Sequence, residues 1–332
     1  MDQTRARVGV VLIGRNEGQR LVRSLDSVHG GSSVVVYVDS GSTDDSCNAA
    51  RQRGAVVVDL DMRQPFTAAR ARNAGFEQLM RDHPQTELVL FVDGDCEVLP
   101  GFVEAAAAEL DADPGLVAVC GWRRERHPER TIYNRLCDVE WRWGVLGPIS
   151  CFGGDVLVRA AAVQAIGGYD AGIIAGEDEE IGVRLRKLGG RLIRIDRDST
   201  LHDADMHSIK QWWQRAKRCG HAYAQVSEIH GAPPERKFVD NLRRSLLWGL
   251  IAPGAAVALT LPTLGLSWAV FARYPVVAAK VARTALGRGF SAPDAVAWGV
   301  SCALSPFPEA LGVAKFHVDR LRNKRPQIIE YK

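Results

Sequence analysis

The sequence lacks the features that mark several classes of protein. Its seven cysteines include no Cys-x-x-Cys pair, which argues against a zinc ribbon or a disulfide framework and favours a reducing compartment. The net charge is only +3, too small to indicate nucleic acid or another polyanion as a partner. We find no internal repeat and no low-complexity tract. The first apolar run, residues 8–13, is too short for a signal peptide, and we expect the N-terminal domain to stay in the cytoplasm.

What the sequence does contain is typical of a globular α/β protein. Its 332 residues, 46% apolar and 24% charged, suffice for one large or two ordinary domains. Between residues 8 and 195, short β-branched runs alternate with amphipathic stretches, a pattern that predicts a largely parallel sheet. The expected strands cover residues 8–13, 34–38, 55–60, 88–92, 117–121, 149–158 and 191–195. The expected helices cover residues 17–28, 43–53, 67–82, 101–110, 160–166 and 177–188.

Two carboxylates follow the expected strand at residues 88–92. They belong to Asp93-Gly94-Asp95, in which the glycine allows a tight turn. Paired hard oxygen ligands suit Mg²⁺ or Mn²⁺, which would bridge to the diphosphate of a nucleotide. Such a triplet also occurs in ordinary surface turns. Its place directly after an apolar strand, where ligands bind in α/β sheets, favours the metal site.

A third carboxylate, Asp39, follows the expected strand at residues 34–38. At a strand end that faces a cleft, it could accept hydrogen bonds from a nucleobase or ribose. Ser42 or Thr43 can cap the helix that begins there. A capped turn would explain the polar residues 42–45 without any function, so both interpretations stay open for them.

Four motifs occur together in one order. They are Ile13-Gly14-Arg15-Asn16-Glu17, Val38-Asp39-Ser40-Gly41-Ser42-Thr43-Asp44, Ala69-Arg70-Ala71-Arg72-Asn73-Ala74-Gly75 and Val92-Asp93-Gly94-Asp95. As a set, over about residues 7–225, they resemble the inverting family 2 glycosyltransferases (GT2) with the GT-A fold, the fold of nucleotide-diphospho-sugar transferases. The sequence departs from the family at Gly14, where a proline is usual.

The resemblance implies a site for a nucleotide-diphosphate sugar. The residues that would contact this donor are Gly14, Asn16, Glu17, Asp39, Arg72, Asp93 and Gly94. Asp95 would be the direct ligand of Mn²⁺ or Mg²⁺, with Asp93 in the metal's water shell or on the ribose. His202 matches a histidine that completes the metal or diphosphate site in many relatives, and imidazole is a reasonable ligand for Mn²⁺. A purely structural histidine is the alternative.

An acidic run at residues 176–180 matches the family's Glu-Asp motif at a helix start. By the resemblance, Asp178 would be the base that deprotonates the acceptor hydroxyl, with Glu177 beside it. Attack opposite a departing diphosphate needs a carboxylate within hydrogen-bond reach of the nucleophile. Acidic residues are also ordinary partners of a helix N-terminus, which is the better interpretation for Glu179 and Glu180. By the resemblance, the glycine-rich segments 152–155 and 167–170 would line the acceptor side.

A basic amphipathic helix is expected at residues 208–229. Arg215 and Arg218 lie three residues apart on one face, where they could meet a diphosphate or simply form a solvated surface. The segment 211–215 does not match the Gln-x-x-Arg-Trp signature of processive family members. We therefore expect the transfer of single sugars.

The pattern of the sequence changes after Leu201, and a Gly-Ala-Pro-Pro linker at residues 231–234 indicates a domain boundary. We predict a catalytic domain over residues 1–230 and a helical, membrane-associated region over residues 231–332. Residues 245–272 carry no ionisable side chain, and 28 residues (272 − 245 + 1) would make a helix of about 42 Å, enough for one membrane span. Pro253 and Pro262 interrupt this segment, so a re-entrant hairpin, two interfacial helices and a buried helical subdomain remain alternatives. A second apolar stretch, residues 290–307, is a weaker candidate.

Basic residues flank these apolar segments on both sides. They are Arg236, Lys237, Arg243 and Arg244 before the first, and Lys315, Arg320, Arg322, Lys324 and Arg325 after the second. Because basic residues gather on the cytoplasmic side, we expect the cytoplasmic face of the cell membrane as the location.

The sequence therefore predicts an inverting glycosyltransferase that moves a sugar from a nucleotide-diphosphate donor to a hydroxyl acceptor. By family analogy and the apolar C-terminal region, the acceptor would be a lipid-linked saccharide in cell-surface polysaccharide synthesis. The alternative is a catalytically inactive, transferase-like scaffold that binds nucleotide at the membrane. A nucleotidyltransferase is disfavoured because residues 14–18 are too short and too acidic for a phosphate-binding loop.

Overall fold

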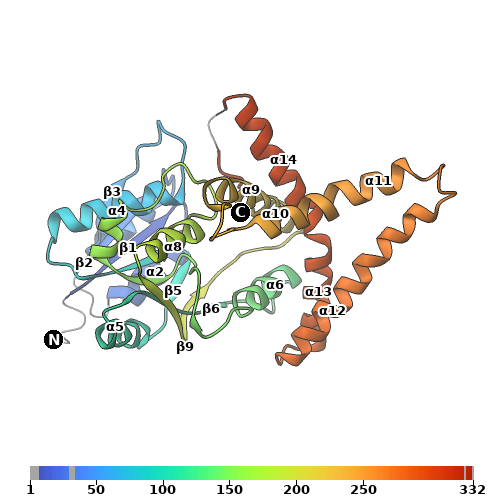
Figure 1. Ribbon diagram of the computed structural model, residues 1–332. Helices are drawn as coiled ribbons and strands as arrows, with labels where there is room; N and C mark the ends of the chain where they lie inside the picture. Colours follow the sequence, from blue (N-terminus) through green and yellow to red (C-terminus); the bar gives the residue numbers. More distant parts are fainter. Residues whose placement is uncertain (1–6, 30–33, 325–326, 331–332) are drawn as a thin grey trace. The chain divides into compact units, whose positions relative to one another are not determined.

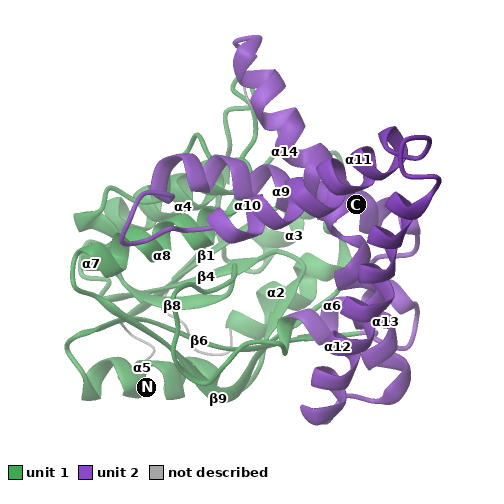
Figure 2. Cartoon of the chain, turned by 45° about the vertical axis from the view of Figure 1, so that its right-hand side comes forward, with its two compact units in different colours: residues 1–126, 141–204 green, residues 127–140, 205–332 purple. Residues whose placement is uncertain are grey.

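A computed structural model describes residues 7–29, 34–324 and 327–330, which form two compact units (Figures 1 and 2). Unit 1 comprises residues 1–126 and 141–204, and unit 2 comprises residues 127–140 and 205–332. Arg325, one of the basic residues expected to flank the apolar segments, lies outside the described residues.

Unit 1 is built on a nine-stranded sheet in the order β3-β2-β1-β4-β8-β6-β9-β5, with β7 paired to β9. In the described part of the chain these strands are β1 Val8–Gly14, β2 Val34–Asp39, β3 Val56–Asp59, β4 Leu88–Asp93, β5 Cys96–Val98, β6 Leu116–Glu125, β7 Gly147–Pro148, β8 Val156–Arg159 and β9 Arg191–His202. Their pairings make β1, β2, β3, β4, β6 and β9 parallel to one another, whereas β5, β7 and β8 run in the opposite direction. The expectation of a mostly parallel sheet is confirmed.

Each face of the sheet is covered by helices that bury an apolar core. Successive residues of a strand point to opposite faces, so Val10 and Leu12 of β1 join one core while Val11 and Ile13 join the other. The first core also takes residues from α2 (Gln19–His29), α3 (Ser46–Gln52) and α5 (Phe102–Ala112). The second takes residues from α4 (Ala68–Asp82), α7 (Ala160–Ala165) and α8 (Glu177–Lys187).

Most of the predicted elements are present, and their differences have local causes. The strand predicted over residues 149–158 is wrong in its first half, because residues 149–155 form a loop that joins β7 to β8. β9 extends to His202, beyond the predicted end at residue 195, because it continues along β6 through register shifts. Strand β5 and helix α6 (Ile132–Trp141) were not predicted.

Unit 2 is helical. Besides most of α6 it contains α9 (Ile209–His230), α10 (Val239–Leu246), α11 (Ala252–Ala258), α12 (Arg273–Gly287), α13 (Ala292–Leu304) and α14 (Pro306–Leu321). Helix α9 packs on α14 at very short range, since a Cβ at Gly220 would collide with the backbone of Glu309, and one at Gly312 with the backbone of Lys217. The two glycines thus allow the helix backbones to touch.

The apolar segment 245–272 does not form the one continuous helix that was considered, because a turn over residues 259–265 divides it. After α10 come a π-helical turn (Leu247–Ile251), α11, a turn and a 3₁₀ helix (Leu266–Ala272). Among the described residues, no helix has both the length and the apolar character needed to cross a membrane. By compactness α9 belongs to unit 2, and the functional division predicted at residue 230 stays a prediction.

Candidate active site

Strand register brings the first predicted site residues together at the carboxyl edge of the sheet. The last residue of β1, Gly14, pairs with Asp39 at the end of β2, and Ile13 pairs with Asp93 at the end of β4. Asp39 in turn pairs with Asp59 at the end of β3. Because parallel strands end at one edge, residues far apart in sequence meet there, which is where α/β proteins bind ligands.

Hydrogen bonds connect the loop after β1 to the loop after β2. Asn16 Oδ1 accepts a hydrogen bond from the backbone N–H of Thr43 at 2.7 Å, and the Asn16 N–H donates to Ser42 Oγ at 2.9 Å. Glu17 pairs with Arg20 at 2.9 Å. A Cβ at Gly94 would lie 3.0 Å from the Ile13 carbonyl oxygen, a tight contact that glycine avoids.

Asp39 is buried, and its carboxylate stabilises the turn that follows it by accepting backbone hydrogen bonds. Its Oδ2 accepts hydrogen bonds from the N–H groups of Gly41 and Ser42, at 3.0 and 2.7 Å, and its Oδ1 accepts one from Tyr37 at 3.0 Å. Burial opposes ionisation, but the hydrogen bonds from Ser42 and Tyr37 hold the pKa of Asp39 below its ordinary value. A charged carboxylate is therefore fixed at the edge of the sheet.

Arg72 on α4 is the centre of a buried charge cluster. Its side chain, 3% exposed, lies 2.9 Å from Asp93 Oδ1, 2.8 Å from Glu177 Oε1 and 3.6 Å from Asp178 Oδ1. Burial disfavours its charge, yet the carboxylates of Asp178 and Asp93 raise the pKa of Arg72 well above its ordinary range. The guanidinium also lies 5.4 Å from the centre of the Tyr169 ring. One arginine thus joins the end of β4 to the start of α8.

Asp178, at the start of α8, has a pKa shifted toward neutral pH. Burial raises the pKa of Asp178 to about 8, and the carboxylates of Glu177 and Asp93 act in the same direction against the opposing charge of Arg72. Its buried Oδ1 accepts no hydrogen bond from the described residues. A carboxylate with a pKa near the working pH is suited to act as a general base.

A second arginine, Arg123, is paired with Asp155 and also lies near the Asp93 carboxylate. Arg123 Nε donates to Asp155 Oδ2 at 2.7 Å, and Arg123 Nη2 lies 3.5 Å from Asp93 Oδ2. Thr200 also donates to Asp155. Burial opposes ionisation of Asp155, but Arg123 holds the pKa of this carboxyl below its ordinary value. A Cβ at Gly154 would collide with the Asp93 carboxylate, so the glycine leaves the space that this carboxylate fills.

The predicted metal ligands Asp95 and His202 meet because strand β5 pairs with the end of β9. Cys96 lies directly opposite His202 in this pairing, which brings Asp95 Oδ1 to 3.3 Å from His202 Nε2, with both side chains 8% exposed. Two ligand atoms at this separation can bind one divalent ion in neighbouring coordination positions. Asp93 groups instead with Cys96 and Asp155.

Sequence reasoning missed several residues that complete this region. Burial raises the pKa of Cys96 well above its ordinary value, so this thiol stays neutral and is a poor partner for a hard cation. The ring of Trp141 lies 4.6 Å from that of His202 and 5.5 Å from the guanidinium of Arg123. Asp155 was named only as part of a glycine-rich segment, and Arg123 at a strand end gave no signal of its own. Their roles depend on pairings that only the folded chain makes.

The two predicted diphosphate contacts on α9 lie in unit 2. Arg215 makes a bidentate ion pair with Glu140, at 2.6 and 2.9 Å. Arg218 follows on the same helix and is half-buried. A donor role for Arg215 would require exchange of its carboxylate partner for the diphosphate, and both assignments stay predictions.

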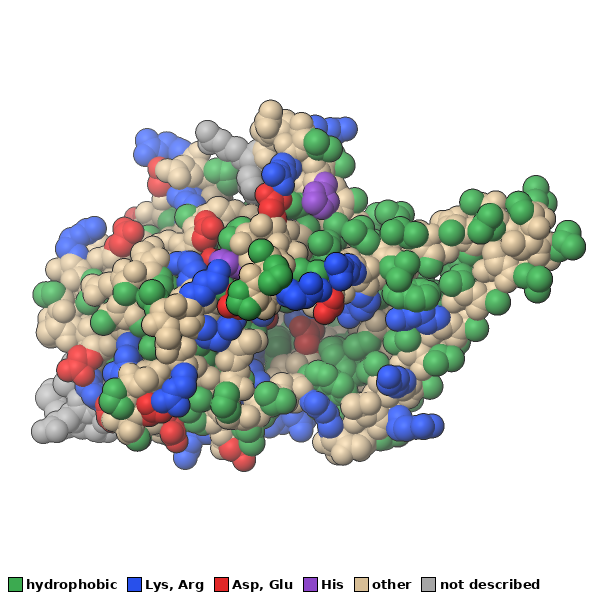
Figure 3. Space-filling model, in the orientation of Figure 1, with side chains coloured by type: hydrophobic (Ala, Val, Ile, Leu, Met, Phe, Trp, Pro, Cys, Tyr) green, Lys and Arg blue, Asp and Glu red, His purple; other side chains and the backbone are tan. Residues whose placement is uncertain are grey.

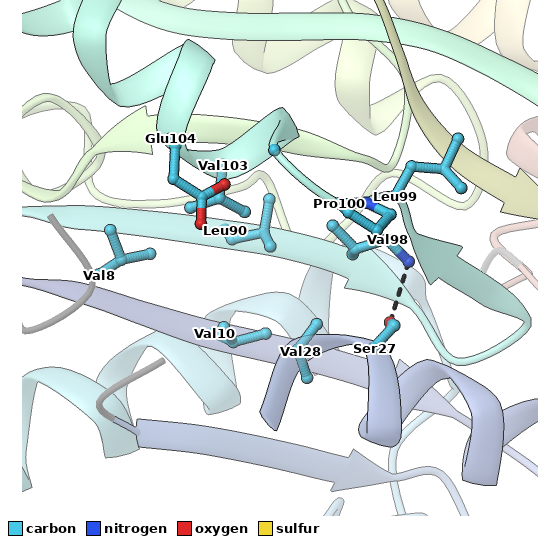
Figure 4. A pocket seen from close by; sticks show the side chains of 11 residues that line it. Val8, Val10, Ser27, Val28, Leu90, Val98, Leu99, Pro100, Val103 and Glu104 are labelled. Atoms are coloured by element: carbon cyan, nitrogen blue, oxygen red, sulfur yellow. Dashed lines mark hydrogen bonds between the residues drawn. The ribbon is translucent and has the colours of Figure 1, made fainter. Parts of the chain in front are cut away.

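A separate pocket lies away from these groups (Figure 4). Its lining is mainly aliphatic, with Val8 and Val10 at the start of β1 and Val98 and Val103, and it also includes the polar side chains of Ser27 and Glu104. The hydroxyl of Ser27 accepts a hydrogen bond from the Val98 N–H at 3.0 Å. Since Val8 opens its strand, the pocket lies toward the amino end of β1, opposite the edge where the carboxylates gather. It carries none of the predicted chemistry.

Comparison with a model of the family described as glycosyl transferase family 2 gives a match over residues 10–150. The chain is a glycosyltransferase with a family 2 domain. The matched range of this glycosyltransferase contains Asp39, Arg72, Asp93 and Asp95, whereas Asp178 lies beyond it.

Two groups of solved structures are similar to this glycosyltransferase. The mannosyltransferase PcManGT from Pyrobaculum calidifontis, in complex with GDP-Man and Mn²⁺, is 20% identical over 95% of this chain and 88% of that chain, with a TM-score of 0.62. Glucosyl-3-phosphoglycerate synthase from Mycobacterium tuberculosis, in complex with Mn²⁺, UDP-glucose and phosphoglyceric acid, is 18% identical over 68% of this chain and 80% of that chain, with a TM-score of 0.51. These similarities confirm the GT-A fold.

Proposed function

We propose that this protein is an inverting glycosyltransferase that transfers one sugar from a nucleotide-diphosphate donor to a hydroxyl acceptor. The observation that carries the proposal is the joint placement of two features at one edge of the sheet. One is the Asp95–His202 pair, at 3.3 Å. The other is the Arg72 cluster, which holds Asp178 beside Asp93.

The donor would bind at the carboxyl ends of β1, β2 and β4. Asp39 and the loop of Asn16 and Glu17 would receive the nucleobase and ribose. Asp95 and His202 would hold Mn²⁺ or Mg²⁺, and the fit of one oxygen and one nitrogen ligand supports this assignment. When bound, the ion neutralises charge on the departing diphosphate. The similar mannosyltransferase and synthase structures contain Mn²⁺ together with a nucleotide sugar, which also supports the proposal.

Asp178 would accept the proton of the acceptor hydroxyl as this oxygen attacks the anomeric carbon. Attack from the side opposite the diphosphate inverts that centre. Arg72 is a positioning residue here, because it ties Asp178 and Glu177 to the end of β4. With a pKa of about 8, Asp178 is basic enough to take the proton and is partly ionised near neutral pH.

We further propose a lipid-linked saccharide as the acceptor, in cell-surface polysaccharide synthesis at the cytoplasmic face of the membrane. Support comes from the segment 245–272, which has no ionisable side chain, and from the basic residues on both of its flanks. A polyprenyl-type anchor would keep the acceptor at a membrane surface, where such a segment can bind.

Calorimetric titration tests the donor site. UDP, GDP, dTDP and ADP are titrated into the protein with and without Mn²⁺, and the best case is repeated with Asp95→Ala and with Asp82→Ala, an exposed carboxylate of α4, as the control. We expect metal-dependent binding that only Asp95→Ala abolishes. Failure of every diphosphate under every metal condition would contradict the proposal. Binding without any release of sugar from the matching donor would favour the inactive scaffold.

A further inference from the structure

Residues 239–287 of unit 2 form a projecting helical hairpin (Figure 1). Its outgoing limb runs from α10 through a π-helical turn into α11, and its return limb is the 3₁₀ helix Leu266–Ala272 followed by α12. The two limbs are joined by a turn over residues 259–265. From residue 249 to residue 272 the hairpin carries no ionisable side chain.

The tip of the hairpin presents large apolar side chains to the outside. Leu261, Leu264 and Leu266 are 86, 94 and 79% exposed, and Trp268 is 51% exposed. In Figure 3 the outer end of the hairpin shows apolar side chains and neither basic nor acidic ones, whereas Lys and Arg gather toward its base. Contiguous apolar surface of this kind usually marks a site of interaction.

The backbone of Leu264 has a conformation that residues other than glycine rarely adopt. Its φ is 51°, a left-handed conformation that costs a non-glycine residue about 1 kcal/mol or more. A glycine or asparagine would adopt it more easily. Since the side chain is almost fully exposed, the folded chain gains no packing from it. Neither packing nor backbone preference within the described chain accounts for a leucine here.

The polar side chains of the tip are hydrogen-bonded within the hairpin itself. Thr263 Oγ donates to the Leu259 carbonyl at 2.7 Å, and Ser267 Oγ donates to the Ala256 carbonyl at 2.7 Å. Trp268 Nε1 donates to Thr260 Oγ1 at 2.9 Å. A surface meant for water does not need such pairing, whereas a surface placed in hydrocarbon does, because unsatisfied polar groups are costly there.

A ring of aromatic and basic groups crosses both limbs at the base of the tip. The guanidinium of Arg273 lies 3.9 Å from the centre of the Trp248 ring, and Tyr274 donates a hydrogen bond to the Trp248 carbonyl at 2.5 Å. Tryptophan, tyrosine and arginine are typical of the headgroup level of a membrane. Further basic residues follow on the return limb, at Lys280, Arg283 and Arg288.

The distance from this ring to the tip matches one leaflet. Eleven residues separate Trp248 from Leu259 (259 − 248), roughly 16 Å at ~1.5 Å per residue. Nine residues separate Leu264 from Arg273 (273 − 264), about 14–18 Å for mixed α and 3₁₀ rise. Half of a ~30 Å hydrocarbon core is about 15 Å.

We propose that the tip of this hairpin, residues 249–272, inserts into one leaflet of an anionic lipid bilayer and stops at the Trp248–Arg273 ring. The inference rests on the membrane location in the proposed function and names the segment that provides it. The basic residues at the base of the hairpin complement anionic headgroups. The acceptor's lipid anchor would lie in the same leaflet.

Vesicle binding tests the proposal with the full-length protein. Sedimentation with vesicles of phosphatidylglycerol and phosphatidylcholine compares the wild type with the triple variant Leu261→Gln, Leu264→Gln, Leu266→Gln. The control replaces three exposed leucines elsewhere, Leu146→Gln, Leu188→Gln and Leu321→Gln, which are 48, 60 and 84% exposed. Each buried leucine contributes about tenfold in partitioning, so we expect the tip variant to bind at least about 100-fold more weakly and the control to bind within about threefold of the wild type.

Depth is read separately from the quenching of tryptophan fluorescence by lipids brominated near the headgroup or deep in the chain. Trp268→Phe should remove most of the quenching by the deep bromines, and Trp248→Phe most of that by the shallow ones. Equal loss from both variants would contradict insertion of the tip, as would unchanged vesicle binding by the tip variant. A wild type that forms dimers without lipid, and a tip variant that is monomeric, would identify a second copy as the occupant and overturn the proposal.

The Mn²⁺-dependent nucleotide binding of each variant is measured in parallel. Loss of vesicle binding with nucleotide binding intact supports the hairpin assignment. If vesicle binding is unaffected while nucleotides bind normally, the hairpin inference fails and the transferase proposal stands. If vesicles bind through the tip but no nucleotide binds, the transferase proposal fails and the hairpin inference stands.

Discussion

Replacement of Asp178 by asparagine should make the protein more stable at alkaline pH and far less active. In the folded chain the pKa of Asp178 is raised to about 8, from an ordinary value of 3.8. Between these two values the folded state holds a proton that the unfolded chain has lost. The stability that Asp178 contributes therefore falls as the pH rises from about 4 to about 8. Asparagine does not ionise and removes this dependence.

The size of the effect follows from the pH interval. Between pH 5 and the pKa of about 8, an interval of about three pH units, Asp178 is ionised in the unfolded chain but protonated in the folded chain. At about 1.4 kcal/mol per unit, the wild type should lose about 4 kcal/mol relative to the variant. For a unit of this size, 1 kcal/mol corresponds to about 2–4 °C in Tm. The Tm of the variant should thus gain roughly 10 °C on the wild type over this interval.

Calorimetric unfolding at pH 5 and pH 8.5, in EDTA and without nucleotide, measures this difference. Glu77→Gln, an exposed carboxylate on α4, is the control and should keep a constant offset from the wild type. In the transfer assay, Asp178→Asn should lower kcat by about 10²–10⁴-fold, the usual contribution of a general base. A Tm difference that stays constant from pH 5 to pH 8.5 would refute the buried, proton-holding state of Asp178. A variant that still transfers sugar at the normal rate would remove its assignment as the base.

Two further substitutions test the cluster around Asp93. In Gly154→Ala the new Cβ would collide with the Asp93 carboxylate and approach Arg72 Nη2 to 2.8 Å, so kcat/KM should fall about 10²-fold. The control Gly287→Ala on α12, where a Cβ has no neighbour within 4 Å, should stay near normal. Equal activity of the two variants would contradict this account. Arg72→Met leaves buried carboxylates without their cation and should lower the free energy of unfolding by about 3–5 kcal/mol, seen as a Tm lowered by roughly 10 °C. The control Arg81→Met, on the exposed end of α4, should change the Tm little. An unchanged Tm in Arg72→Met would show that the cluster is not an electrostatic unit.

Much of the fold could be predicted because its signals are local. The alternation of β-branched residues located most strands of the sheet, and the three carboxylates that follow two of these strands marked the edge where ligands bind. Asp39 and Asp93 could be assigned to that edge without any coordinates, because parallel strands end together. The loop over residues 149–155 was misjudged because its first residue still bonds to β9, where the Ile149 N–H donates to the Leu192 carbonyl at 3.0 Å, whereas the strand that pairs with β4 begins only at Val156.

Pairings across long stretches of sequence could not be predicted. Asp95 and His202 are 107 residues apart (202 − 95), and only the antiparallel pairing of β5 with β9 places their side chains at 3.3 Å. Arg123 and Asp155 were overlooked for the same reason. Spacing and periodicity give no signal for such a contact between different elements, and only the family resemblance assigned Asp95 and His202 to one metal site.

The sequence by itself determined the α/β architecture, the acidic residues at the strand ends and the apolar segment near the C-terminus, because periodicity and spacing are properties of neighbouring residues. Only the tertiary structure decided what these residues do. Burial beside Arg72 gives Asp178 a pKa that its position at a helix start does not predict. Likewise, the turn at Leu264 converts a run of 28 residues that was long enough for one span into a hairpin whose leucines point outward. Solvent exposure and electrostatic environment depend on which parts of the chain lie side by side, and that is fixed only when the chain folds.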